Sequence, residues 1–168
     1  FLNEPTTFKL EDNTTYSPGN FNDKYAYKEI NLAQAIAVSD NIYAVKTHLF
    51  LGKENLASLI KKFGIEDVEA NASLALGTLN TNIYNLANMY NTLASEGVYN
   101  HLYTIEKITN NEGKIIYQHK AQNKQMLNKD SCLALSQLLT ASFDNRYSTY
   151  LQATMAAYKL ENTNACKT

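Results

Sequence analysis

The sequence has little of what metal centres and disulfide frameworks are built from. Its 168 residues include two cysteines and three histidines. Cys132 and Cys166 stand 34 positions apart, without the close spacing of zinc ligands and without a second pair to form a disulfide framework. His48, His101 and His119 are scattered, so we interpret each as a surface or boundary residue rather than a ligand. We therefore expect no metal site and no organic cofactor.

A local excess of one charge and long apolar runs are also lacking. The 15 lysines and arginines balance 16 aspartates and glutamates, and no basic stripe runs along the chain, so nucleic acid is not an expected partner. The apolar stretches are far shorter than the roughly 20 residues of a membrane span. The first residues, FLNEPTT, have no initiator methionine and no basic or apolar part of a signal peptide. We expect one domain, or part of one, cut out of a longer chain.

Local signals predict two short helices on either side of residues 39–40. Asn31 and Gln34, three apart in NLAQAIAV, form a capping-box pattern that opens a helix ending near Val38. A second helix is expected after Ser39–Asp40, because three apolar residues share one face and Gly52 is placed to end it. Those apolar residues are Ile42, Val45 and Leu49. The turn between the two helices would bring a serine and an asparagine close together.

Two further helices follow from the same periodicity. In KENLASLIKKFG, apolar residues recur at helical spacing before Gly64, and in NIYNLANMYNTLASEG they form a strong stripe closed by Gly97. The first set is Leu56, Leu59, Ile60 and Phe63, and the second is Ile83, Leu86, Ala87, Tyr90, Leu93 and Ala94. The second is the most clearly predicted helix of the chain.

The rest of the chain predicts one hairpin and two helices. LYTIEKI and KIIYQ are rich in β-branched and aromatic residues, and TNNEG between them is typical of a hairpin turn. A helix is expected to start between Asn128 and Ser131, and STYLQATMAAYKL predicts a shorter one, with a strand beginning at the chain's end. The predicted fold class is therefore α+β, predominantly α, with one β-hairpin.

The triplet Ser39, Asp40 and Asn41 raises the question of whether it is structure or chemistry. A serine before a helix is ordinarily a cap, since its oxygen accepts from an unpaired N–H of the first turn. With nine serines and 21 asparagines, about one Ser-x-Asn is expected by chance. The triplet alone therefore favours Ser39 and Asp40 as plain helix caps, and its context must decide.

That context resembles a known family. YSPGNFNDKYAYKEINLAQAIAVSDNIYAVK, residues 16–46, resembles the segment of class A penicillin-binding proteins, the bifunctional cell-wall synthases, that leads into the second motif of their transpeptidase domain. KKFGI, SLALGTLNTNIYNLANMYNTLASEGVY and IEKITNNEGKIIY follow in the family's order. The resemblance covers nearly the whole chain and is weaker at the N-terminus and between Gln118 and Leu160. Lys167 and Thr168 would begin the third motif, Lys-Thr-Gly.

The resemblance implies the helical part of a penicillin-binding and serine β-lactamase-like transpeptidase domain. Residues 1–168 would be a partial domain, with the nucleophile motif and most of the central sheet outside the chain. The family's first motif, Ser-x-x-Lys, matches only Ser58 and Lys61, which lie in the third helix after the second motif. We interpret that pair as helix surface and expect the nucleophile upstream of Phe1.

The resemblance also implies roles for four residues. Ser39 would help to pass a proton to the leaving amine, and Asn41 would hold the backbone of the stem peptide. Lys167 would supply positive charge, and Thr168 a hydroxyl for the carboxylate of a substrate ending in D-Ala-D-Ala. Cys166 replaces the glycine that usually precedes the lysine in this family, and its larger side chain could crowd the site.

The implied function is that of a serine D,D-transpeptidase, which cross-links peptidoglycan stem peptides and is acylated by β-lactam antibiotics. It would act on the outer face of the bacterial cytoplasmic membrane, in a parent protein with an upstream membrane anchor and glycosyltransferase domain. The 168 residues alone should be inactive. Two alternatives remain open: a non-catalytic module of the same fold that senses muropeptides or β-lactams, and a helical interaction module without an active site.

Overall fold

The computed structural model describes residues 1–158. The chain forms two compact units. The first comprises Phe1–Asn80 together with the described residues from Leu135 onward, and the second comprises Thr81–Ala134. The boundary falls within helix α5 (Lys129–Leu139), which is therefore shared between the two units. No helix of the described residues has the length and apolar character needed to cross a membrane.

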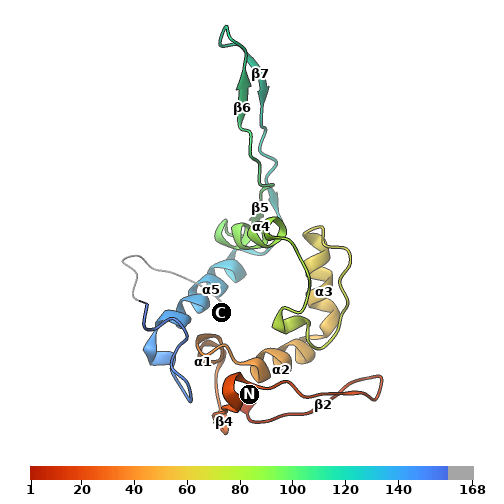
Figure 1. Ribbon diagram of the computed structural model, residues 1–168, viewed down its shortest axis with the longest axis vertical. Coiled ribbons are helices and arrows are strands. Elements are labelled where there is room, and N and C mark those ends of the chain that lie inside the picture. The colour runs from red at the N-terminus through yellow and green to blue at the C-terminus, as the bar shows by residue number, and fades with distance from the viewer. Residues whose placement is uncertain (159–168) are drawn as a thin grey trace. The chain divides into compact units, whose positions relative to one another are not determined.

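Three consecutive helices form the centre of the first unit (Figure 1). These are α1 (Leu32–Ala37), α2 (Asn41–Leu51) and α3 (Lys53–Lys62). The predicted capping box opens α1, since the Asn31 side chain accepts from the Gln34 N–H and the Gln34 side chain accepts from the Asn31 N–H. Gly52, with φ of 90°, ends α2 as predicted and immediately precedes α3. All three sequence predictions of helices in this region are confirmed.

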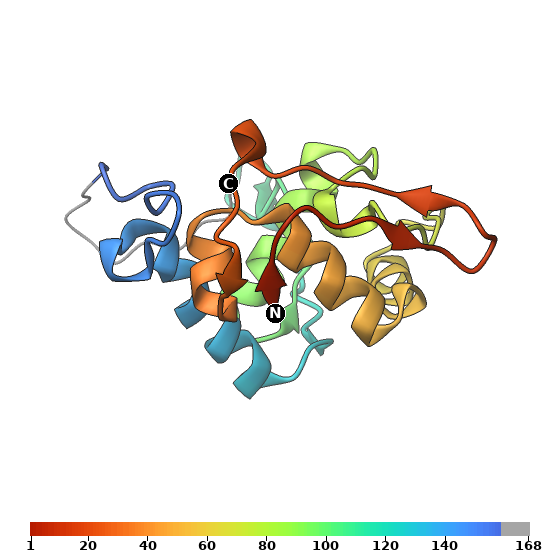
Figure 2. The same cartoon turned by 90° about the horizontal axis from the view of Figure 1, so that it is seen from below.

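Two short strand pairs, which the sequence analysis did not predict, flank these helices. Strand β1 (Leu2–Asn3) pairs antiparallel with β4 (Lys28–Glu29), and β2 (Phe8–Lys9) pairs with β3 (Thr15–Tyr16). Figure 2 shows the β2–β3 hairpin extending past α2. The Lys53 ammonium lies 2.9 Å from the Glu11 carboxylate, which ties the hairpin to the start of α3. With two residues each, these strands have too little periodicity to be recognised from sequence.

The C-terminal part of the first unit packs against α1 through small side chains. It contains the 3₁₀ helices η3 (Thr140–Phe143) and η4 (Asn145–Tyr147). One buried cluster joins this part to α1, and its members are Ala37, Ala141, Ala153 and Ala156. A second buried cluster, of Ala57, Val68 and Leu74, joins α3 to the 3₁₀ helix η2 (Leu74–Leu76). Alanines let the backbone segments approach closely, so the first cluster brings residues 141–156 against the end of α1.

The helix predicted within STYLQATMAAYKL is wrong for the residues that the structure describes. Residues 148–158 form turns and irregular structure. The Thr154 N–H donates to the carbonyl of Ala37 at 2.8 Å, and the Met155 N–H donates to the carbonyl of Ser142 at 2.8 Å. A helix would need these amides for bonds four residues back along the chain. Packing against α1 and η3 has therefore overridden the local helical pattern.

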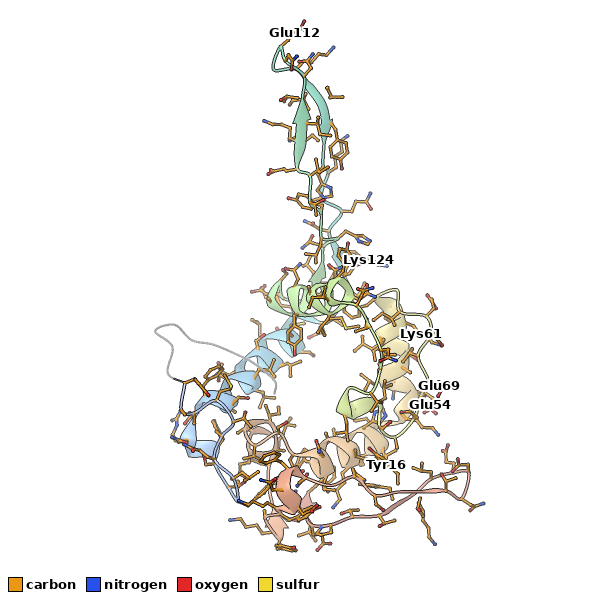
Figure 3. The ribbon with its side chains drawn as sticks, in the orientation of Figure 1. Tyr16, Glu54, Lys61, Glu69, Glu112 and Lys124 are labelled. Carbon is orange, nitrogen blue, oxygen red and sulfur yellow. The ribbon has the colours of Figure 1, made fainter. Side chains whose placement is uncertain are left out.

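The second unit contains one long helix and two antiparallel strand pairs. Helix α4 (Ile83–Ala94) precedes β5 (Val98–Tyr99), which pairs with β8 (Lys124–Gln125). Strand β6 (Lys107–Thr109) pairs with β7 (Ile115–Gln118). Figure 3 shows Glu112 at the tip of this hairpin. The predicted helix in 82–97, the predicted hairpin and the helix predicted to start between Asn128 and Ser131 are confirmed, as is the predominantly helical α+β class.

The apolar stripe of α4 is largely exposed. The side chain of Ile83 is 81% exposed, and Leu86 and Tyr90 are also exposed. The buried residues of this helix are Asn88 and Thr92, whose hydroxyl donates to the carbonyl of Asn88 at 2.8 Å. The periodicity therefore located the helix correctly, while the described residues leave much of its apolar face uncovered.

Gly97 is expected to be intolerant of a side chain, in contrast to Gly113. Both have left-handed φ, 88° and 79°, so alanine adds about 1 kcal/mol of backbone strain at either position. A Cβ at Gly97 would also overlap the backbone carbonyl oxygen of Leu127, whereas nothing lies within 4 Å at Gly113. Gly97→Ala should therefore lower the free energy of unfolding by about 2 kcal/mol more than Gly113→Ala. Chemical denaturation followed by far-UV circular dichroism would measure both, and equal losses would contradict the steric account.

Candidate active site

Ser39 ends the first helix of the site and does not begin the second. Its N–H donates to the carbonyl of Ile36 at 3.2 Å, and the N–H of Asp40 donates to the carbonyl of Ala35 at 2.9 Å. This pair of bonds is the Schellman motif, in which the residue after the C-cap adopts the left-handed conformation and is usually glycine. Ser39 occupies that position with φ of 56°. The reading of Ser39 as an N-cap is therefore wrong, because its backbone serves the C-terminus of α1.

Asp40 is the N-cap of α2 and the centre of a buried polar network. One oxygen of its carboxylate, Oδ1, accepts the N–H of Tyr43 at 2.7 Å. The other, Oδ2, accepts from Asn3 Nδ2 at 2.5 Å, Asn20 Nδ2 at 2.9 Å and the Tyr150 hydroxyl at 2.6 Å. The residue is only 4% exposed. A buried carboxylate is stable only where donors replace water, and here four donors do so.

Asn20, which lies about 20 residues before α2 in the sequence, accepts hydrogen bonds from the first backbone N–H groups of that helix. Its Oδ1 accepts the N–H of Asn41 at 2.9 Å and the N–H of Ile42 at 3.2 Å, which are among the amides that a helix leaves unpaired at its start. Its Nδ2 donates to Asp40 and contacts the Tyr150 hydroxyl at 3.0 Å. Asn20 therefore acts as a second cap and links the first turn of α2 to the Asp40 network.

Tyr150 remains a neutral hydrogen-bond donor within this network. Burial, and then the hydrogen bond to the Asp40 carboxylate and its negative charge, raise the pKa of the Tyr150 hydroxyl well above its usual range. Each of these effects disfavours a phenolate beside a carboxylate. The hydroxyl therefore stays protonated, and able to donate to Asp40, at neutral pH.

A cavity of about 590 Å³ opens beside the turn between α1 and α2. This volume is in the range of small-ligand sites. Ser39 and Asn41 both line it, and Asn41 Nδ2 donates to the carbonyl of Gly19 at 2.7 Å. The remaining lining residues are Gly19, Asn20, Phe21, Val38, Leu151, Gln152 and Thr154. The two site residues predicted within the described chain therefore share one cavity.

The other residues considered in the sequence analysis are not among the described residues that line this cavity. Lys167, Thr168 and Cys166 lie outside the described residues, as does the strand predicted at the chain's end. Ser58 and Lys61 lie on the exposed surface of α3, as expected for one side of an amphipathic helix, and Figure 3 shows Lys61 on this helix.

Sequence reasoning missed Asn3, Asn20 and Tyr150. Asn20 was indistinguishable from the other asparagines of this asparagine-rich chain. Tyr150 lies 110 residues from Asp40, and nothing in its neighbourhood links it to residue 40. Asp40 itself was interpreted from the sequence as a helix cap together with Ser39, and the structure confirms Asp40 as the N-cap of α2.

No group of three histidine, cysteine, aspartate or glutamate side chains that could hold a metal ion occurs among residues 1–158. His48, interpreted from the sequence as a surface or boundary residue, is buried, and its ring Nε2 lies 3.0 Å from the carbonyl of Asn71. A backbone carbonyl accepts hydrogen bonds, so Nε2 carries the proton. The ring is accommodated in the core because this bond replaces one to water.

The architecture has the penicillin-binding and β-lactamase-like fold. The D,D-transpeptidase domain of a peptidoglycan glycosyltransferase from Eggerthella lenta matches with a TM-score of 0.76 at 19% identity, over 99% of this chain and 46% of that one. Penicillin-binding protein 1A from Haemophilus influenzae matches with a TM-score of 0.66 at 21% identity, over 98% of this chain and 23% of that one.

Sequence comparison then identifies the family. The model described as penicillin binding protein transpeptidase domain matches residues 1–162. The chain belongs to the penicillin-binding protein transpeptidase family, which confirms the resemblance. Penicillin-binding protein 2D of Bacillus subtilis (strain 168) is 40% identical over 153 residues, which are 90% of this chain and 22% of that protein. Penicillin-binding protein 1B of Haemophilus influenzae is 28% identical, over 77% of this chain and 17% of that protein. The chain thus spans about a fifth of these relatives' length.

Removing the carboxylate of Asp40 should destabilise the protein substantially. Asp40→Ala removes the N-cap of α2 and takes this acceptor away from the buried amides of Asn3 and Asn20 and from the half-buried Tyr150 hydroxyl, so we expect a loss of about 3 kcal/mol in the free energy of unfolding. Asp12→Ala is the matched control, since Asp12 also accepts from a backbone N–H, that of Thr14, but in an exposed turn. That variant should lose less than about 1 kcal/mol. Denaturant titration of both variants measures the difference, and similar losses would argue against a buried network.

Proposed function

We propose that this chain is part of a serine D,D-transpeptidase domain that cross-links peptidoglycan stem peptides ending in D-Ala-D-Ala. The observation that carries the proposal is that Ser39 and Asn41 both line a cavity of about 590 Å³, in a chain of the penicillin-binding protein transpeptidase family. β-Lactams would acylate the same nucleophile as the stem peptide. The names of the relatives, which are penicillin-binding proteins, support this substrate class.

In this proposal Ser39 moves a proton. When a serine nucleophile attacks the D-Ala-D-Ala peptide bond, its proton passes to a base, and the leaving amine must gain a proton before it departs. A serine hydroxyl can donate and accept at once, so it can pass that proton across a short distance. The two backbone bonds that hold the turn fix Ser39 in its left-handed conformation. A fixed backbone limits the positions that the hydroxyl oxygen can take to the few side-chain rotamers of serine.

Asn41 binds the substrate backbone in this proposal. An amide group offers both a donor and an acceptor, which matches the alternating groups of a peptide. The hydrogen bond from Asn41 Nδ2 to the carbonyl of Gly19 sets the orientation of the amide. Orientation set before binding lowers the entropy that the complex must lose.

The remaining machinery is proposed from the family pattern. Lys167 would supply positive charge, and Thr168 a hydroxyl for the terminal carboxylate of the substrate. The nucleophile motif and most of the central sheet would lie outside residues 1–168, so the chain alone is expected to be inactive. The complete protein would be anchored in the cytoplasmic membrane upstream of this chain and act on its outer face.

Covalent labelling with a fluorescent penicillin tests the function. The complete protein, extended beyond both ends of this chain, should give a fluorescent band on a denaturing gel, and the 168 residues alone should give none. A folded complete protein that stays unlabelled would reject the transpeptidase. Binding of muropeptides or β-lactams without a covalent band would then indicate the sensing module, and binding of neither the interaction module.

Substitution of Ser39 separates chemistry from structure. Ser39→Gly relieves the left-handed strain, so it should leave the free energy of unfolding unchanged or raise it by up to about 1 kcal/mol. Ser39→Ala keeps the strain. Both lack the hydroxyl, and both should acylate at least about a hundredfold more slowly than the wild type. Thermal unfolding and the labelling rate of the complete protein measure the two effects. A Gly variant that labels at the wild-type rate would show that Ser39 is structural.

A further inference from the structure

We propose that Tyr150 is a positioning residue for acyl transfer, whose hydroxyl links the Ser39 turn to the part of the cavity lining that follows Tyr150 in the sequence. The inference rests on the proposed function. It assigns a role to a residue that no sequence motif marks and that does not itself line the cavity.

The Tyr150 hydroxyl uses both its donor and its acceptor capacity in the network. It donates to Asp40 Oδ2 at 2.6 Å, and Asn20 Nδ2 lies 3.0 Å away as its donor. Asp40 follows Ser39 directly, and Asn20 binds the N–H of Asn41. A single hydroxyl thus contacts the two side chains that fix the backbone on either side of the Ser39–Asn41 turn.

Tyr150 also fixes one side of the cavity. The three residues Leu151, Gln152 and Thr154, which follow it closely, line the cavity together with Ser39 and Asn41. Thr154 is anchored by its N–H to the carbonyl of Ala37. The wall between Tyr150 and Thr154 is therefore pinned at both ends to the helices that carry the turn, at Asp40 and at Ala37.

Loss of the hydroxyl should loosen the site without unfolding the protein. Without it, the Asp40 carboxylate keeps three donors, from Tyr43, Asn3 and Asn20. The fold retains the Asp40 cap of α2 and the buried alanine cluster that packs residues 141–156 against α1. What is lost is the link between the Ser39 turn and the cavity lining formed by Leu151, Gln152 and Thr154. Small displacements at a catalytic site slow the chemical step far more than they change stability.

Tyr150→Phe in the complete protein tests the proposal. The rate of fluorescent-penicillin acylation is measured over a range of drug concentrations, which separates the acylation rate constant from the noncovalent binding constant, together with the fraction labelled at saturation. We expect the rate constant to fall about tenfold with the labelled fraction unchanged. Tyr147→Phe is the control, because Tyr147 packs its ring against the alanine cluster in the same segment. It should acylate at the wild-type rate, and 3-fluorotyrosine at position 150, which keeps the hydroxyl, should restore most of the rate.

The remaining outcomes are separable. A wild-type rate constant in Tyr150→Phe overturns the positioning role and leaves the transpeptidase intact. A smaller labelled fraction that reacts at the wild-type rate, or a variant that does not fold, shows a purely structural role and also overturns it. If the wild-type protein itself is not labelled, the proposed function has failed, which is a different result from failure of Tyr150.

Discussion

The Asp40 carboxylate is the interaction on which the described site depends. Moving a carboxylate out of water costs several kcal/mol unless hydrogen-bond donors replace the solvent. Here one donor is the nearby Tyr43 N–H, and the other three are the side chains of Asn3, Asn20 and Tyr150, which belong to segments well separated in sequence. The need to satisfy one buried charge therefore draws the N-terminal strand, the loop before β4 and the C-terminal segment to the same turn.

The turn that Asp40 occupies serves two helices at once. Its residues close α1 through a Schellman motif and open α2 through an N-cap, with no spacer between them. Glycine would adopt the left-handed conformation at position 39 without strain, yet the chain has serine there. A strained residue at a site lined by a cavity is expected where the side chain has a function that outweighs the cost in stability. The strain at position 39 therefore supports the role proposed for Ser39 on grounds that do not depend on the family.

Helix α4 and the β6–β7 hairpin both expose large apolar side chains. Ile83 and Leu86 on α4, and Ile115 and Ile116 on the β6–β7 hairpin, are exposed. The chain matches 46% of the Eggerthella lenta domain structure. Contiguous apolar faces ordinarily pack on other elements.

The sequence by itself determined the local elements and the family. The capping box of Asn31 and Gln34, the stop at Gly52 and the TNNEG turn each act within a few residues, so their signals are readable in order. The Ser-x-Asn turn was found because its context follows a family pattern. Only the tertiary structure decided that Ser39 closes a helix, that residues 148–158 are not helical and that Tyr150 reaches Asp40. Ser39 closes its helix through local bonds to Ile36 and Ala35 that its residue type does not signal, since glycine is usual there. The other two outcomes depend on which distant groups pair with the amides of residues 154 and 155 and with the Asp40 carboxylate when the segments pack together.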